Sequence, residues 1–72
     1  MMTFHIYRNR DDAPMRVPAI NIDDAIEMTY AHHRAVDIDV SDPRFVTIQT
    51  ATHYFVISER PLTRDLIDDL YH

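Results

Sequence analysis

The chain of 72 residues is predicted to form a small α+β domain, an antiparallel sheet covered by helices on one side. Two observations predict this class. Runs of alternating apolar and polar residues, typical of strands, flank a stretch with apolar residues at helical spacing. The composition, 46% hydrophobic and 26% charged, is that of a folded globular protein. We expect a single domain over residues 1–72, with the element order strand, strand, helix, strand, strand, helix.

The first elements are predicted to be two strands. Residues 2–8 alternate between apolar and polar side chains, which indicates a strand. The polar stretch 9–14 is typical of a turn. Residues 15–20 can return as a second short strand, and Pro18 confines it to an edge of the sheet or to an irregular position, because proline lacks the N–H of the ladder.

Asn21 is the predicted N-cap of a helix that runs from Ile22 to about Ala35. Its side chain can cap the first turn, and Asp24, three residues on, provides a carboxylate version of the capping box. Spacing the residues 100° apart separates an apolar arc from the charged residues. The apolar arc comprises Ile22, Ala25, Ile26, Thr29, His33 and Val36. This arc is expected to pack on the sheet.

Two β-rich runs, residues 44–50 and 53–58, are predicted to form a hairpin. With Ala51 and Thr52 as the turn, alternate side chains of both runs face the core. The core pairs are then Val46 with Ile57 and Ile48 with Phe55. A two-residue turn favours residues with positive φ, so a longer loop with a shifted register stays open.

Thr63 is the predicted N-cap of a short C-terminal helix. Leu62 and Ile67 can pack against each other on either side of this cap as a hydrophobic staple. The inward side chains of the helix are then Leu66, Ile67 and Leu70.

The second face of the sheet is expected to be open and aromatic. The residues of this candidate interface are Tyr7, Phe45, Tyr54 and Val56. One interpretation is a surface for a partner or for a homodimer. The other is ordinary β-propensity, since tyrosine, phenylalanine and valine favour strands wherever they point.

The composition argues against catalysis. The chain has no Gly, Lys or Cys, and therefore no glycine-rich phosphate loop, no Schiff-base amine and no thiolate. Asp37, Asp39 and Ser41 follow the first ligand spacings of a calcium loop, but the later glycine and glutamate are missing. His32 and His33 are adjacent and cannot easily share one ion. We expect no enzymatic activity, no metal and no cofactor.

The net charge of −5 is concentrated in residues 21–43 and 61–72. Acidic surfaces repel phosphate backbones, so the expected partner is a basic protein and not nucleic acid itself. In an extended chain Asp37 and Asp39 would lie about 6.6 Å apart on one face, comparable to neighbouring phosphates. The candidate partner-binding residues are Asp23, Asp24, Glu27, Asp37, Asp39, Asp42, Asp65, Asp68 and Asp69. The alternative is that arginines such as Arg8, Arg10 and Arg44 neutralise them.

The longest apolar run is far shorter than the roughly 20 residues that cross a bilayer, so no membrane association is expected. The absence of a basic stretch followed by an apolar segment at the N-terminus argues against export. The lack of cysteine favours an intracellular setting.

In its architecture the chain resembles small phage-encoded anti-CRISPR proteins. The likeness rests on the short, acidic, cysteine-free sequence and on the helix of residues 21–35 between a first strand and the hairpin 44–58. This resemblance implies a non-enzymatic inhibitor, in the cytoplasm of a bacterial host, that binds a subunit of a CRISPR surveillance complex. It would block DNA binding or nuclease recruitment. The element order is also similar to the β-grasp fold of ubiquitin-like proteins, but the chain has no terminal Gly-Gly and no lysine.

Overall fold

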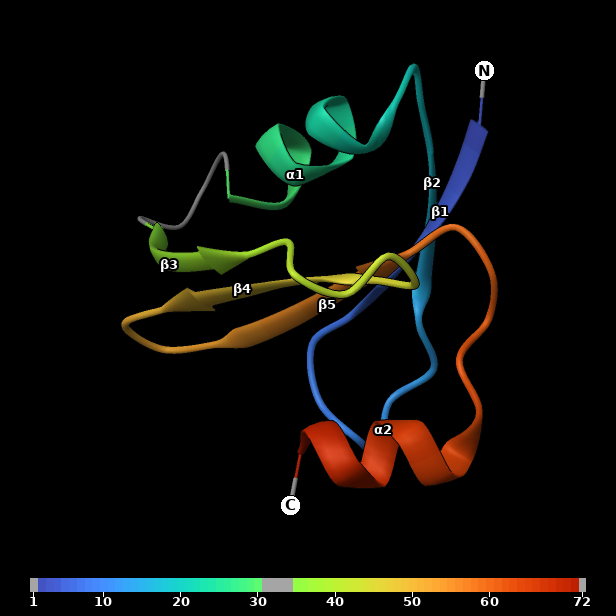
Figure 1. The fold of residues 1–72 in the computed structure, drawn as a ribbon, viewed down its shortest axis with the longest axis vertical. Coiled ribbons are helices and arrows are strands. Elements are labelled where there is room, and N and C mark those ends of the chain that lie inside the picture. Colours follow the sequence, from blue (N-terminus) through green and yellow to red (C-terminus); the bar gives the residue numbers. More distant parts are fainter. Residues whose placement is uncertain (1, 31–34, 72) are drawn as a thin grey trace.

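A computed structural model describes residues 2–30 and 35–71, which form a five-stranded antiparallel sheet with a helix on each face (Figure 1). The strand order is β2-β1-β5-β4-β3. The elements are β1 (Met2–Tyr7), β2 (Met15–Ala19), α1 (Ile22–Tyr30), β3 (Ala35–Asp39), β4 (Val46–Thr50), β5 (Tyr54–Ser58) and α2 (Arg64–Leu70). The predicted α+β class with an antiparallel sheet is confirmed.

The predicted element order is wrong between α1 and β4, where the structure has an additional strand. The helix α1 ends at Tyr30 and does not continue to about Ala35, where β3 begins. The reason is the alternation of acidic and apolar residues from Asp37 to Val40, which fits the two-residue period of a strand and not the helical period. Val36 therefore belongs to β3, and His33 lies outside the described residues.

The predicted hairpin register is confirmed. Val46 faces Ile57 and Ile48 faces Phe55 across β4 and β5. No described residue has positive φ, so a side chain builds the turn instead. The Thr50 hydroxyl accepts hydrogen bonds from the amides of Thr52 (3.3 Å) and His53 (2.9 Å). This bonding compensates for the missing asparagine or glycine.

Helix α1 begins with the predicted cap. The Asn21 side chain accepts from the Asp24 amide at 2.9 Å. The Asp24 carboxylate in turn accepts from the Ile20 amide at 3.1 Å, one residue before the expected partner. Ala25 and Ile26 are buried on one sheet face. The strand residues in this first core are Phe4, Ile6, Val46, Ile48, Phe55 and Ile57.

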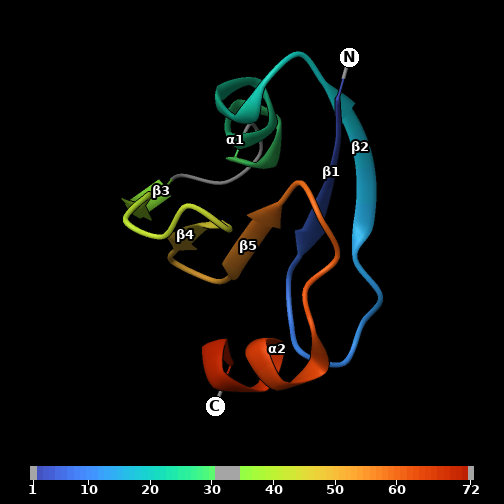
Figure 2. The same ribbon diagram turned by 45° about the vertical axis from the view of Figure 1, so that its right-hand side comes forward.

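Helix α2 covers the opposite face of the sheet, so the prediction of helices on one side is wrong (Figure 2). Thr63 caps α2 as predicted, its hydroxyl accepting from the Leu66 amide at 3.3 Å. Ile67 is buried against Tyr7 and Val56. Leu62, Leu70 and Tyr71 complete this second core, together with Phe45 and Tyr54. Both faces of this sheet carry apolar side chains, so a helix on each face removes more apolar area from water than two helices on one face.

Two tyrosines fix α2 to the sheet. The Leu62 amide donates to the Tyr7 hydroxyl at 2.9 Å. The described pairing of β1 with β5 stops at Tyr7 and Val56, which leaves the Tyr54 carbonyl beyond the ladder. The Tyr71 hydroxyl donates to this carbonyl at 2.6 Å and lies 3.2 Å from the Tyr7 carbonyl oxygen. Burial raises the pKa of Tyr71 above its ordinary range.

Candidate protein-binding surface

The predicted aromatic interface is not open. Tyr7 and Val56 are 5% and 0% exposed beneath α2, and Phe45 and Tyr54 are half-buried in the same core. Tyr7 and Val56 therefore contact α2 and have almost no surface for a partner. The sequence pattern correctly indicated apolar side chains on this face, but not that a later segment of the chain covers them.

The sheet divides eight of the nine predicted acidic residues into two groups. Asp23, Asp24 and Glu27 lie on α1, on one face. Asp39 lies opposite Thr47, and Thr47 lies opposite Val56, so Asp39 and its alternate neighbour Asp37 are on the α2 face. Helix α2 carries Asp65, Asp68 and Asp69 on this second side. Asp42, which follows β3, lines one pocket together with Asp23 and another together with Asp39, so it lies between the two groups.

Asp39 of the second group and Asp42 lie near the C-terminal end of α2. Asp39 and Asp42 line a cavity of about 250 Å³ whose wall includes Leu70 of α2. Asp39 and Asp42 are close in sequence, and the distant segment α2 contributes Leu70 and no carboxylate to this cavity. Asp42 is not a free charge there, because Arg44 holds it with side-chain hydrogen bonds of 2.8 and 3.1 Å. These bonds lower the pKa of Asp42 and raise that of Arg44.

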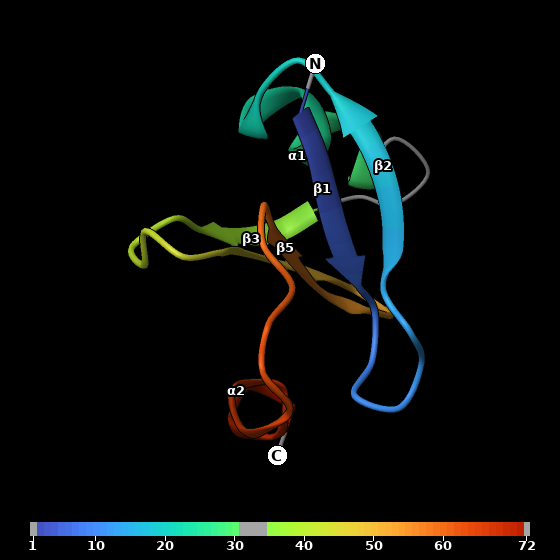
Figure 3. The same cartoon turned by 90° about the vertical axis from the view of Figure 1, so that its right-hand side faces the viewer.

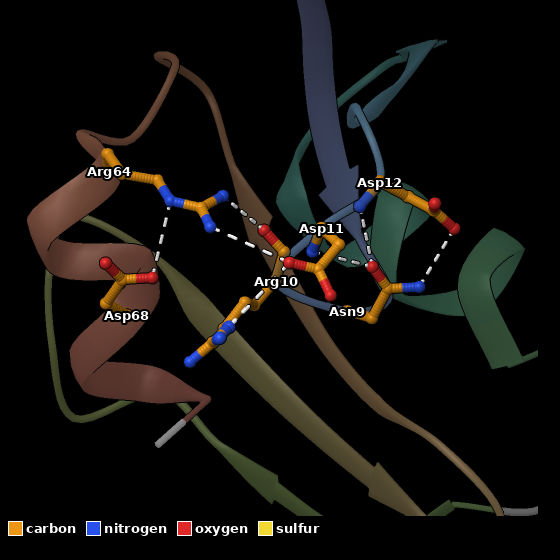
Figure 4. A network of polar contacts seen from close by, with 6 residues as sticks. All are labelled: Asn9, Arg10, Asp11, Asp12, Arg64 and Asp68. Carbon is orange, nitrogen blue, oxygen red and sulfur yellow. Dashed lines mark hydrogen bonds and ion pairs between the residues drawn. The ribbon is translucent and has the colours of Figure 1, made fainter.

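A second arginine neutralises an acid of α2 (Figure 4). Arg64 forms ion pairs with Asp68 at 3.4 Å and with Asp11 at 3.7 Å. It also donates to the Arg10 carbonyl at 2.6 Å. Asn9 orders the same loop by accepting from the amides of Asp11 and Asp12. This network ties the β1–β2 loop to α2, and Figure 3 shows that loop near the helix.

Arginines therefore neutralise some predicted acids but not all. Arg8 and Arg10 pair with Asp12 and Asp11 in their own loop and with none of the nine candidates. Asp23, Glu27, Asp37 and Asp65 are exposed, and no described basic residue forms an ion pair with any of them.

Asp39 is exposed and held in its charged form. Its carboxylate accepts from the Ser41 amide at 2.8 Å. Hydrogen bonds from the Ser41 side chain and amide lower the pKa of Asp39, so the charge persists at mildly acidic pH. In the described part of the chain, Asp39 forms no ion pair with a basic side chain.

Strand β3 is an edge of the sheet, as Figure 2 shows on the side opposite β2. The exposed residues Asp37, Ile38 and Asp39 of β3, together with Val40 directly after it, are called the β3 edge surface. Ile38 and Val40 are 39% and 65% exposed. Ile38 faces the buried Ile48, so its side chain lies on the α1 face, opposite the two aspartates.

The surface residues that the sequence prediction did not include are Ile38 and Val40. Their alternation with Asp37 and Asp39 is itself a strand signal. No strand was predicted for this segment and only the acids of an extended form were considered, so the two exposed apolar side chains were not considered as contacts.

The described residues contain no group of three or more His, Cys, Asp or Glu side chains placed to hold a metal ion. Within the same residues, none of the helices has the length and apolar character needed to span a bilayer.

Comparison of the chain with models of protein families, with curated proteins and with solved structures found no match. The resemblances to anti-CRISPR and ubiquitin-like proteins therefore stay predictions.

Proposed function

We propose that this protein is a non-catalytic inhibitor that binds a basic, nucleic-acid-binding protein through the β3 edge surface. One observation carries the proposal. Asp37 and Asp39 are exposed on a sheet edge and have no described basic partner, whereas Asp42 and Asp68 are paired with arginines. A basic partner would supply the missing countercharges.

The charge distribution supports a protein partner in preference to nucleic acid. The chain carries a net charge of −5, which repels a phosphate backbone over distances of about a Debye length. The same field accelerates the approach of a basic protein. A protein whose natural ligand is nucleic acid has a basic surface that contacts the phosphates. An acidic protein bound to that surface excludes the nucleic acid.

The particular target that we propose is a DNA-binding subunit of a CRISPR surveillance complex, with a bacterial cytoplasm as the setting. The support for this target is the architectural resemblance to small anti-CRISPR proteins together with the exposed acids of β3. The two aspartates are alternate residues of a strand, so their spacing is about 6.6 Å. That spacing suits arginines or lysines that normally contact successive phosphates.

The test is a gel-shift titration of a purified type I surveillance complex with labelled target DNA. We expect the protein to prevent the shift at concentrations near those of the complex, and to co-elute with the complex on size exclusion. DNA binding that persists across several subtypes, without co-elution, would overturn the CRISPR target.

Matched variants locate the contact. Asp37→Asn combined with Asp39→Asn should weaken inhibition by about tenfold or more, equivalent to about 1.4 kcal/mol of binding free energy. The control combines Asp23→Asn with Glu27→Gln, which removes the same charge from exposed positions on the other sheet face. Equal losses in the two variants would contradict a contact at β3.

A further inference from the structure

We infer that the partner binds by adding a strand to the free edge of β3, and that this strand alternates basic and apolar residues. The inference rests on the proposed function, because it assumes a basic protein partner, and it specifies how that partner is held. It follows from the backbone of β3, from the two sides of that strand and from its charge.

The backbone groups of Ile38 point away from the sheet. At the β4–β5 turn the Thr50 amide donates to the His53 carbonyl at 2.8 Å. Backbone groups alternate in direction along a strand, so Thr50 and Ile48 face β5, whereas Gln49 and Thr47 face β3. Asp37 and Asp39 lie opposite Gln49 and Thr47 and direct their amides and carbonyls to β4. Those of Ile38, between them, face outward.

The same alternation explains the other edge of the sheet. Continued through β5 and β1, it places the backbone groups of Met15, Val17 and Ala19 toward β1 and those of Arg16 and Pro18 outward. Pro18 has no N–H and is suited to an outward position. The prediction that Pro18 confines this strand to an edge or an irregular position is thus confirmed. Its ring blocks strand addition at β2, and no described proline lies within β3.

A second copy of this chain fits the β3 edge poorly. Antiparallel pairing of two β3 strands centred on Ile38 would place Asp37 of each copy opposite Asp39 of the other. Like charges directly opposite each other destabilise a pair of strands. Aspartates are ionised near neutral pH, and Ser41 lowers the pKa of Asp39 further, so protonation of that carboxylate does not relieve the repulsion. Pairing of two β3 edges is therefore disfavoured, and pairing of β3 with a positively charged strand is favoured.

The two sides of β3 specify the pattern of the incoming strand. A residue opposite Ile38 has its side chain on the α1 face, beside the exposed part of Ile38, and an apolar residue fits there. Its two neighbours face Asp37 and Asp39, where arginine or lysine forms ion pairs. Main-chain hydrogen bonds to Ile38 supply affinity, and the alternation supplies selectivity.

The probe is a fluorescently labelled peptide with the sequence Val-Thr-Arg-Val-Arg-Thr-Val. Its central valine would face Ile38, and its two arginines would face the aspartates. We expect binding that weakens with salt, and loss of binding when both arginines are replaced by glutamate. Fluorescence anisotropy measures the affinity. Amide hydrogen exchange measured by NMR should show slower exchange at Ile38 in the complex.

Backbone methylation separates strand addition from simple charge attraction. Methylating the nitrogen of the central valine removes the donor that faces β3, and should weaken binding by about tenfold or more. Methylating the backbone nitrogen of one arginine, whose N–H points away from β3, should have little effect. The two peptides have the same charge and composition, so only the direction of the lost donor differs.

The outcomes distinguish failure of the inference from failure of the proposed function. If both methylated peptides bind as well as the parent, or if Ile38 exchange is unchanged, strand addition is wrong while binding of a basic partner stands. If arginine and glutamate peptides bind equally or not at all, and the surveillance complex is not inhibited, both fail. A dimer in sedimentation velocity, with Ile38 protected without peptide, would assign the edge to a second copy and overturn the inference.

Discussion

Single side chains complete hydrogen bonding at the places where regular structure ends. The Thr50 hydroxyl builds the β4–β5 turn, and the Tyr71 hydroxyl satisfies the Tyr54 carbonyl beyond the β1–β5 ladder. A buried carbonyl without a donor costs about 1–3 kcal/mol. Asn21 and Thr63 could be recognised from their neighbours in sequence, because a cap bonds within three residues. The role of Tyr71 could not be recognised in this way, because Tyr54 is distant from it in sequence and only the folded structure brings the two residues together.

Tyr71 predicts a stability change at alkaline pH. Burial raises its pKa above the ordinary 10.0, so the folded state holds a proton that the unfolded chain has lost. The contribution of Tyr71 to the free energy of unfolding should therefore be constant below pH 10 and should decrease as the pH rises above it. Urea denaturation at about pH 9 and about pH 11 measures the change. In Tyr71→Phe the decrease should be smaller, and an equal decrease would contradict this origin.

The elements differ in how far local sequence specifies them. The β4–β5 hairpin follows its alternation closely, and both helices begin at their predicted caps. β3 was missed because Val36 fits the helical arc of α1 whereas Asp37 to Val40 alternate, so two periods compete in one segment. Pairing with β4 favours the extended form, since it satisfies the backbone groups of Asp37 and Asp39.

Helix α2 depends strongly on its cap, because only seven residues form it. Thr63→Ala should lower the free energy of unfolding by about 1 kcal/mol. Thr63→Ser keeps the hydroxyl and should restore most of that loss. Urea denaturation followed by circular dichroism compares the two variants. Equal destabilisation by both substitutions would show that the threonine methyl group, and not the cap hydrogen bond, matters.

As a unit the protein is a small sheet whose two faces carry separate cores, and its stability depends on covering both. A chain of this length buries only about 60% of its unfolded surface, so either core represents a large part of the total. The positions of the charges also depend on this arrangement. Opposite sheet faces separate the acids of α1 from those of β3, and arginines from other segments neutralise Asp42 and Asp68.

Removal of α2 is therefore expected to abolish cooperative folding. A truncated chain of residues 1–61 would expose Tyr7 and Val56, which are buried in the full chain. It would also lose the Tyr71 hydrogen bond to Tyr54. Thermal unfolding by circular dichroism should lose its sigmoidal transition, and sedimentation velocity should show self-association. A cooperative, monomeric fragment would contradict an integral role of α2.

Local patterns in the chain were sufficient for the α+β class and the two helix caps, because each depends on neighbouring residues or on alternation. They favoured the observed hairpin register and limited β2 to an edge or an irregular position, and the tertiary structure decided both. They also identified Asp37 and Asp39 as candidates. They did not identify β3, the burial of Tyr7 and Val56, or the acids that arginines neutralise. Those features depend on contacts between segments far apart in sequence, such as α2 with β1, and only the folded arrangement brings these segments together.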